Sequence, residues 1–465
     1  METLQRMANR GSISTGYDID NSIKFEADNT EYLKWTDFDD NASDARKRTF
    51  SISLWCKRTE LGVQHLIWNS GANGYLSFEA GDVIKWQQQY GGTAKTLNTN
   101  RLFRDTAAWY HIIVAVDSTQ STEANRVRLY VNGVEETSFS SATYPAEDAT
   151  SDNIYGDYLS LGRSVAWGAG FSGYVADYLF VSEVQLVPTD VGEFDSDTGI
   201  WKPKAYDGTI STPSHFLEFQ DGSDLGTATS GLDADTMNNI AAADQATDTP
   251  TNNFCTLNPL VKFKYTTNGI TEGGTTFGDD TGGGVGGAYG TFGVTAGKWY
   301  WECKLVQQNA HYIGVSAVDD GDNVTASSDP QDVNSTFDFA IAAARIEYVT
   351  SGTKTYGSTD AFTDFHSDGD IIGIALNMDD NQISIYGNGT EQTGVDDSSL
   401  YDAENKMCVP FHATINDTVQ YNFGGYSAWT PSSVANDANG YGSFEYAPPS
   451  GYYALCTKNL AEFGG

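Results

Sequence analysis

The sequence predicts an all-β protein made of two antiparallel β-sandwiches that are joined by an ordered connector. Its 465 residues include 26 Tyr, 23 Phe and 48 Gly, and this composition favours strands and tight turns over helical bundles. Apolar and polar residues alternate with a period of two in many segments, as in strands that pack on one side. The phrases FCTLNPL (Phe254–Leu260) and LCTKNL (Leu455–Leu460) stand about 200 residues apart, a domain-sized separation that predicts two modules.

Residues 21–190 are expected to form the first sandwich. The stretch FSISLWCKR (Phe50–Arg58) alternates apolar and polar residues, whereas WYHIIVAVDS (Trp109–Ser118) is the nearly continuous apolar run of an inner strand. Asn132 and Gly133 separate two alternating segments. Because both residues accept a positive φ, they predict the tight turn of a hairpin.

The order of these segments resembles the concanavalin A-like, laminin G-type jelly-roll family. The landmarks are the Trp-His strand WYHIIVAVD, the hairpin VRLYVNGVEE, the strand LSLGRS and the closing strand in FSGYVADYLFVSEVQLVPTDV. The resemblance implies two curved antiparallel sheets with loops gathered at one rim. It also implies use as a glycan-binding or protein-binding module.

Periodicity fades in residues 191–253, which we interpret as the connector. The segment is rich in turn residues and contains one plausible strand, HFLEF. Trp201 and the pair Phe216 and Phe219 need an apolar surface to pack on, so we expect this connector to be ordered.

Strands return in residues 254–465, whose order resembles the SPRY domain family. The landmarks are GKWYWECKL, YIGVSAV, DIIGIALNMDDNQISIYGNG, CVPFHATIN and VQYNFGG. The resemblance implies a second β-sandwich that binds partners through rim loops and carries no catalytic residues. The two C-T-x-N phrases bracket this module, and the first and last strands of a sandwich often lie side by side. We therefore expect the two phrases to pair.

The charge excludes several classes of partner. The chain has 26 Lys and Arg against 62 Asp and Glu, a net charge of −36. Such a surface repels nucleic acid phosphates, because duplex binding depends on Lys and Arg displacing counterions. It also repels anionic membranes, and the chain shows no apolar run near the roughly 20 residues of a membrane span. We expect neither nucleic acid binding nor membrane insertion.

Cysteine usage and the N-terminus point to synthesis in a cytoplasm. The five cysteines are widely spaced and form no CxxC pair, which argues against a zinc site and a disulfide framework. The first residues, METLQRMANRGSISTG, lack the apolar core of a signal peptide. Residues 1–20 are polar with few strand signals, and we interpret them as an arm that fastens the protein to an assembly partner.

A candidate glycan site lies in DVIKWQQQY, which places Trp86, Gln88 and Tyr90 on one face of a strand. Aromatic rings stack on the apolar faces of sugars while amides bond the hydroxyl groups, so this face could bind glycan. The alternative, that Trp86 is a core residue, is the stronger of the two. Trp167, in the loop SVAWGAGF, is a second candidate because an exposed loop aromatic indicates use.

Calcium is the one candidate cofactor. Asp319, Asp320 and Asp322 gather around a glycine in DDGDN, and calcium takes six to eight oxygen ligands. Pro330 stands where an EF-hand needs its twelfth-position Glu, so a solvated acidic loop is the stronger interpretation. Asp177 stands where laminin G-like relatives place an acidic residue, and some relatives hold calcium near it. A structural hydrogen bond to a neighbouring loop is the stronger interpretation of Asp177.

Three patterns associated with catalysis or nucleotides are present but have unsuitable surroundings. EADNTE (Glu26–Glu31) fits the E-x-D-x-x-E string of laminarinases, yet it lacks the apolar alternation of an inner strand, so we interpret it as a solvated acidic turn near the first strand. GGGVGG (Gly282–Gly287) fits G-x-G-x-x-G without the following helix that a nucleotide site requires. None of the six His stands in a Ser-His-Asp or HExxH arrangement. We therefore expect no enzymatic activity.

The layout of a laminin G-like unit followed by a SPRY unit resembles structural proteins of tailed phages, notably marine ones. This resemblance implies a virion protein, a fibre or an exposed head or tail component, made in the host cytoplasm. Its partners would be other virion proteins, host surface glycans and further copies of itself, with a trimer as one arrangement. A glycan-active enzyme and a cellular adhesin remain the alternatives.

Overall fold

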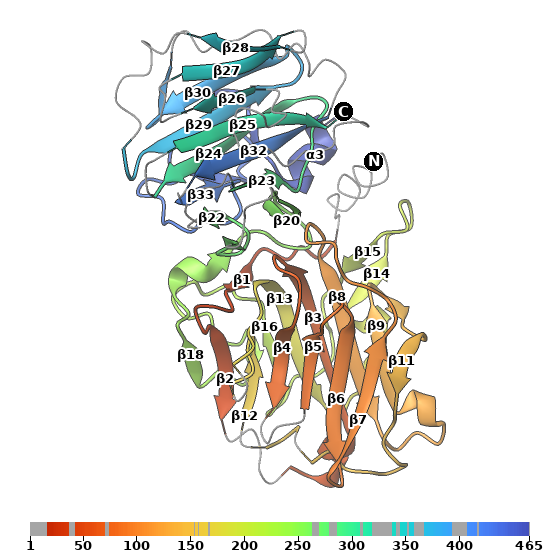
Figure 1. The fold of residues 1–465 in the computed structure, drawn as a ribbon. Coiled ribbons are helices and arrows are strands. Elements are labelled where there is room, and N and C mark those ends of the chain that lie inside the picture. Colours follow the sequence, from red (N-terminus) through yellow and green to blue (C-terminus); the bar gives the residue numbers. More distant parts are fainter. Residues whose placement is uncertain are drawn as a thin grey trace. The chain divides into compact units, whose positions relative to one another are not determined.

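A computed structural model gives the fold of the chain (Figure 1). It describes residues 16–36, 42–69, 74–152, 154–156, 158–165, 168–262, 269–278, 286–306, 310–318, 337–340, 345–350, 353–357, 367–392, 407–415 and 418–464. The described residues are built almost entirely from strands, and they divide into two units, one up to Thr251 and one from Asn252. The predicted all-β class and its two antiparallel sandwiches are confirmed.

The first unit is a sandwich of two antiparallel sheets. Within the described residues one sheet has nine strands, in the order β10-β9-β8-β3-β13-β1-β19 with β16 and β17 beside β13. These strands are β1 (Ser22–Phe25), β3 (Thr49–Arg58), β8 (Tyr110–Asp117), β9 (Val127–Val131), β10 (Val134–Glu135), β13 (Gly173–Ser182), β16 (His215–Leu217), β17 (Ser230–Gly231) and β19 (Gln245–Ala246).

The other sheet of this unit has eight strands among the described residues, in the order β11-β7-β6-β5-β4-β12-β2-β18. These strands are β2 (Tyr32–Thr36), β4 (Gln64–Asn69), β5 (Gly74–Phe78), β6 (Ile84–Tyr90), β7 (Thr93–Thr99), β11 (Phe139–Ala142), β12 (Tyr158–Leu161) and β18 (Thr236–Asn238). A hairpin and short helices complete the unit: β14 (Gly192–Phe194), β15 (Trp201–Pro203), α2 (Asp44–Arg48), η1 (Glu123–Asn125), η2 (Pro188–Asp190) and η3 (Ala242–Asp244).

The core lies between the two sheets and consists of the alternate residues that face inward. Trp35, Phe50 and Leu97 are among its fully buried members. The alternation predicted for β3 is therefore the alternation between this core and the outer face. Strand β8 departs from the pattern, because Ile112 and Val114 enter the core while Ile113 and Ala115 are buried on the opposite side of the sheet.

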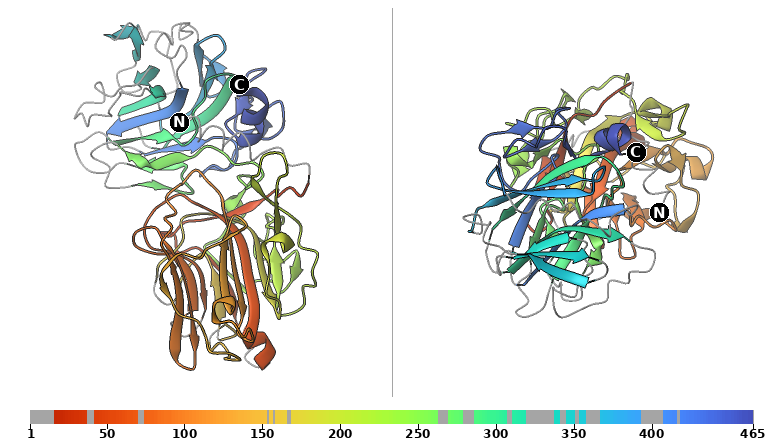
Figure 2. Two further views of the ribbon diagram at one scale, coloured as in Figure 1. Left: turned by 90° about the vertical axis from the view of Figure 1, so that its right-hand side faces the viewer. Right: turned by 90° about the horizontal axis from the view of Figure 1, so that it is seen from above.

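The segment that was expected to be a connector, 191–253, contributes strands and a covering layer to the first unit. Strand β16 pairs with β13, β18 with β2 and β19 with β1. Its apolar residues join a second cluster on the outer face of the nine-stranded sheet, with members Ile113, Ala115, Tyr130, Leu179, Val181, Leu186, Val191, Tyr206, Ile210 and Phe216. This second cluster explains why β8 is apolar on both faces. Figure 2 gives two further views of these layers.

The second unit contains two further sheets. Within the described residues one has seven strands, β20 (Leu257–Lys262), β23 (Gly286–Gly290), β32 (Met407–Ile415), β25 (Ala310–Val318), β26 (Phe337–Ala340), β27 (Arg345–Thr350) and β28 (Thr353–Gly357). The other has eight, β21 (Ile270–Thr271), β22 (Thr276–Gly278), β33 (Thr418–Asn422), β24 (Lys298–Leu305), β29 (Ile371–Asn377), β30 (Gln382–Gly387), β31 (Thr390–Glu391) and β36 (Tyr453–Ala454). The strands β34 (Ala435–Asn436) and β35 (Ser443–Phe444) and the helix α3 (Thr457–Phe463) follow these sheets.

The two C-T-x-N phrases pair, as the sequence predicts. Phe254 and Cys456 form an antiparallel bridge, and the amide of Cys255 donates to the carbonyl of Leu455 over 2.9 Å. The amide of Thr457 in turn donates to the carbonyl of Asn253 over 2.8 Å. The chain is thus fastened to itself where the second sandwich starts and where it finishes.

Residues 1–15 of the expected N-terminal arm lie outside the described residues, and residues 16–20 contact the first unit. The Ile19 amide and carbonyl both bond to the hydroxyl of Thr251, over 3.1 and 2.8 Å. Among the described residues, no helix has the length and apolar character needed to cross a membrane.

Candidate functional site

The expected glycan face of strand β6 lies inside the first sandwich. Trp86 and Tyr90 belong to the central core, with Trp86 only 2% exposed. Gln88 is also buried, and its amide Nε2 donates to Ser151 Oγ over 2.7 Å. This corrects the prediction that Trp86, Gln88 and Tyr90 form a glycan platform, because side chains that fill the space between two sheets cannot stack on a sugar.

The opposite face of the same strand is polar. Gln87 on this face is buried, whereas Lys85 and Gln89 keep part of their surface exposed. Register places Lys85 beside Ser77 on β5 and Asn98 on β7, and it places Gln87 beside Tyr75 and Thr96. His65 on β4 pairs with Ser77. We call this group the polar face; its members are His65, Tyr75, Ser77, Lys85, Gln87, Gln89, Thr96 and Asn98.

Tyr75 is the centre of the polar face. Lys85 Nζ donates to the Tyr75 hydroxyl over 2.6 Å and lies 5.1 Å from the centre of its ring. The hydroxyl group of Tyr75 in turn donates a hydrogen bond to Gln87 Oε1 over 3.2 Å. The ring of His65 lies 5.4 Å from that of Tyr75, tilted by 48°. The Lys85 ammonium, the Gln87 amide and the His65 imidazole therefore all contact Tyr75 on one face of the sheet.

The electrostatics of the polar face keep His65 uncharged near neutral pH. Burial lowers the pKa of His65, the nearby Glu79 carboxylate works against this effect, and the Lys85 ammonium adds to it. Ser77 Oγ donates to Glu79 Oε1 over 2.7 Å. Lys85, Gln89, Thr96 and Asn98 keep part of their surface exposed, so amide, hydroxyl and ammonium groups reach solvent beside an aromatic ring.

Sequence reasoning missed the polar face because it followed the aromatic residues of β6. Both faces of KWQQQY carry glutamine, so alternation alone does not say which one is buried. The useful signal was the neighbouring hairpin partner, in which Tyr75 and Ser77 alternate with the apolar Leu76 and Phe78.

Four of the other predicted residues, Trp167, Asp319, Asp320 and Asp322, lie outside the described residues. Within the part of the chain that the structure describes, no group of three or more His, Cys, Asp or Glu side chains could hold a metal ion. Asp177 is described, and its carboxyl group hydrogen-bonds Tyr17. A calcium role for Asp177 stays a prediction.

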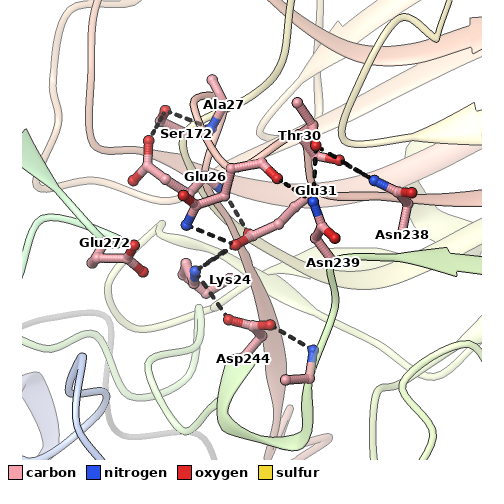
Figure 3. A network of polar contacts seen from close by, with 12 residues as sticks. Lys24, Glu26, Ala27, Thr30, Glu31, Ser172, Asn238, Asn239, Asp244 and Glu272 are labelled. Atoms are coloured by element: carbon pink, nitrogen blue, oxygen red, sulfur yellow. Dashed lines mark hydrogen bonds and ion pairs between the residues drawn. The ribbon is translucent and has the colours of Figure 1, made fainter.

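The laminarinase-like string EADNTE is part of a buried ion-pair network (Figure 3). Lys24 Nζ lies 3.0 Å from Glu31 Oε1 and 2.9 Å from Asp244 Oδ1. Glu31 Oε2 also accepts the amide of Glu26 over 2.7 Å, and Glu26 Oε1 accepts Ser172 Oγ over 2.9 Å. Burial raises the pKa of Glu31 in spite of the Lys24 ammonium. Glu26 and Glu31 are 2% and 3% exposed and bond internal partners, so the interpretation of the string as a solvated turn is wrong.

Ser53 and His111 lie at the distance of a nucleophile and its base, but their hydrogen bonds do not suit catalysis. Ser53 Oγ is 2.9 Å from His111 Nε2, and Trp201 Nε1 donates to His111 Nδ1 over 2.9 Å. Because an indole can only donate, His111 Nδ1 is the acceptor, and Nε2 carries the proton that it donates to Ser53. Burial lowers the pKa of His111 to about 3. The imidazole therefore cannot take a proton from Ser53 through Nε2.

Comparison with known proteins finds one family match, which lies in the first sandwich. Residues 27–189 match the model of the family described as the concanavalin A-like lectin/glucanases superfamily. No curated protein matches the chain.

The comparison with solved structures gave several matches with low TM-scores. The SPRY domain of human HERC1 is 19% identical, with 36% of this chain and 96% of that chain covered and a TM-score of 0.25. Domains LG4-5 of the mouse laminin α1 chain are 9% identical, with 96% and 89% covered and a TM-score of 0.30. A heptameric pentraxin of Limulus polyphemus is 12% identical, with 36% and 77% covered and a TM-score of 0.24. The family match covers strands β2 to β13 of the first unit, whose two antiparallel sheets form a β-sandwich.

Proposed function

We propose that the protein is a non-enzymatic adhesion protein that binds carbohydrate through the polar face of its first sandwich. The observation that carries this proposal is the row of polar side chains on the outer side of the eight-stranded sheet, where Lys85, Gln89 and Thr96 keep part of their surface exposed. The outward side of the nine-stranded sheet is instead apolar and covered by the segment that follows β13. Of the two outer faces, the polar one is therefore suited to a hydrophilic ligand.

The chemistry of the polar face fits sugar hydroxyl groups. Gln89 supplies an amide and Thr96 a hydroxyl group, each of which both donates and accepts, and Lys85 donates from an ammonium group. The sheet backbone holds these side chains at fixed spacing, so the number of rotamers lost on binding is small. A single site of this kind binds weakly, and several copies on one particle would supply avidity.

We further propose the setting of a phage virion, as a fibre or an exposed head or tail component made in the host cytoplasm. Its partners there are other virion proteins, host surface glycan and further copies of the chain. The order of a laminin G-like and a SPRY-like module in the sequence supports this setting. Mass spectrometry of purified particles from an infected host tests it, and absence of the chain from particles refutes it.

The carbohydrate proposal is tested by binding the purified protein to immobilised host-surface polysaccharide. Lys85→Ala and Gln89→Ala should each weaken binding by about tenfold, the effect of losing one hydrogen bond to a charged or amide group. Lys204→Ala is the matched control, because its ammonium bonds the Thr189 carbonyl outside the polar face. Equal binding by all three variants contradicts the proposal. A parallel series with EDTA tests the expected calcium.

A further inference from the structure

Lys24 lies between two carboxyl groups in the interior of the first sandwich (Figure 3). Its Nζ is 3.0 Å from Glu31 Oε1 and 2.9 Å from Asp244 Oδ1, and all three side chains are buried. Lys24 belongs to β1, and Asp244 is the last residue of η3, directly before the strand β19 that pairs with β1. The sheet therefore holds a primary amine in contact with two carboxyl groups, and these are the reactants of an amide bond.

Glu31 is the less suitable of the two carboxyl groups for losing an oxygen. Its Oε2 accepts the Glu26 amide over 2.7 Å, and its Oε1 accepts Asn29 Nδ2 over 3.2 Å, so both oxygens already serve a second donor. Loss of either oxygen would leave a donor without its acceptor, which is costly in a protein interior. Glu31 is suited instead to exchange protons with the Lys24 ammonium, which contacts both of its oxygens at 3.0 and 3.2 Å.

Asp244 can lose an oxygen and keep the hydrogen bond that orients it. Its Oδ2 accepts the Ala241 amide over 2.8 Å, while its Oδ1 contacts the Lys24 ammonium. An amide bond formed at the carboxyl carbon Cγ would retain Oδ2 as the carbonyl oxygen, and this oxygen could still accept the Ala241 amide. Asp244 is therefore the carboxyl group that these contacts favour for bond formation.

Burial favours the uncharged forms of these groups. It is the largest cause that raises the pKa of Glu31, and the Asp244 charge raises it further, although the Lys24 ammonium lowers it. A proton that passes from Lys24 to Glu31 leaves a neutral amine, the form of lysine that attacks a carbonyl carbon. The interior also keeps water away from the amide once it has formed.

We propose that Lys24 and Asp244 are joined by an intramolecular amide bond, with Glu31 as the proton carrier. The new bond links Lys24 Nζ to Asp244 Cγ, and the bond between Cγ and Oδ1 breaks. Of the three ammonium protons one stays on the nitrogen, and the other two leave with Oδ1 as one water molecule. Glu31 takes a proton from the nitrogen and returns it to the departing oxygen, so it is unchanged at the end.

The bond would replace a buried ion pair with a neutral amide. It cancels one positive and one negative charge, and so removes the cost of keeping both out of water. It also closes a covalent loop from residue 24 to residue 244, which spans most of the first unit. A cross-link that closes a long loop stabilises the folded state, because it restricts the unfolded chain. The bond concerns the stability of this unit and is independent of carbohydrate binding.

Tryptic peptides of the full-length protein test the bond. Trypsin cleaves after Lys24 in the free chain and separates peptide 11–24 from peptide 25–34, whereas an amide on Nζ blocks this site. After a week of incubation at pH 7.5, the digest of the denatured protein should contain peptide 11–34 joined to peptide 205–262, lighter than their sum by one water molecule. Absence of this joined peptide, with cleavage after Lys24, would overturn the proposal.

Peptide mapping also distinguishes the partners that Lys24 and Asp244 could have. A bond from Lys24 to Glu31 would lie within peptide 11–34. A bond at a second buried pair, Lys57 and Asp248, whose Nζ and Oδ2 are 2.8 Å apart, would join peptide 49–58 to peptide 205–262. Either result in place of the expected one would overturn the assignment.

Variants separate the roles of the residues. Asp244→Asn should form the same joined peptide with loss of ammonia instead of water, and Asp244→Ala should form none. Glu31→Gln keeps the size of the side chain but cannot carry the proton, so the bond should form about 10²–10⁴-fold more slowly. Asp207→Ala, which changes an exposed aspartate of the same tryptic peptide, is the control and should react like the wild type.

Circular dichroism of each variant verifies that its strands are kept, so that a loss of the bond through unfolding is recognised. Joined peptide at the wild-type rate in a folded Glu31→Gln protein would refute the role of Glu31. Joined peptide in Asp244→Ala would refute the role of Asp244.

Discussion

Lys24→Met is the substitution whose effect can be worked out most fully from the structure. The Lys24 ammonium lies within 3.0 Å of carboxylate oxygens of Glu31 and Asp244, and the three side chains are 2%, 3% and 9% exposed. Methionine keeps the length of the side chain and removes the charge. The substitution leaves two buried carboxylates facing each other across the position of the lost ammonium (Figure 3).

Removal of one partner from a buried ion pair destabilises a protein by about 3–5 kcal/mol. Two carboxylates lose their partner here, so we expect a loss near the upper end, about 5 kcal/mol at pH 7.5. Burial already raises the pKa of Glu31, and loss of the ammonium raises it further. A raised carboxyl pKa gives stability that is present at low pH and lost as the pH rises through it. The loss should therefore be smaller at pH 5.

The assay is the urea dependence of hydrogen exchange in peptides that cover β1 and β2, at pH 7.5 and pH 5. Lys204→Met serves as the control, since an exposed lysine away from such a network should change stability by less than about 0.5 kcal/mol. The double variant Lys24→Met/Glu31→Gln should recover part of the loss. A loss below about 1 kcal/mol at pH 7.5, or an equal loss at both pH values, would refute the reasoning.

Three further predictions concern the cores of the two units. Trp86→Ala should lower the unfolding free energy by about 3–5 kcal/mol in urea titrations, because it empties a core position, and a loss below about 1 kcal/mol would place Trp86 outside the core. Burial raises the pKa of Glu302 from its ordinary 4.5 to about 7, so the stability of the wild type relative to Glu302→Gln should fall by about 3 kcal/mol between pH 4.5 and 7.5; a pH-independent difference would contradict this. Gly133→Ala should unfold at a temperature several degrees lower, because Gly133 has a φ of +76° and packs against the ring of Trp201; an unchanged melting temperature would argue against that packing.

Strand β6 illustrates how far alternation carries a prediction. The period of two in KWQQQY correctly predicts a strand and separates Lys85 and Gln87 from Trp86 and Tyr90. It does not say which set is buried, since each carries polar groups. The larger apolar area of the aromatic rings decides the matter, and Gln88 is buried with them because Ser151 satisfies its amide.

Residues 191–253 show a different limit of sequence reasoning. Their strands are two or three residues long, too short for any period to appear. The partners of these strands are distant in sequence, as when Ser22 pairs with Ala246. The one usable signal was that Trp201 needs a surface, and its contacts with His111 and Phe194 bear this out.

Long-range polar contacts were equally hidden. Tyr17, Asp177 and Glu218 come from three separate segments, and Lys24 meets Asp244 from the far end of the unit. No local pattern marks such residues, because each is an ordinary polar residue until the sheet order is known. The pairing of the two C-T-x-N phrases could be predicted, because the repeated sequence marks both of the segments that pair.

That pairing has a consequence for how the second unit could be handled as a part. With Phe254 and Cys456 side by side, its two chain ends leave the sandwich at one place, so a short linker could close them into a ring. New termini could then be opened at a surface turn such as Asn388-Gly389, where both residues already have positive φ. Because the two chain ends are close together, the unit could also be inserted into a loop of another protein with little strain on either protein.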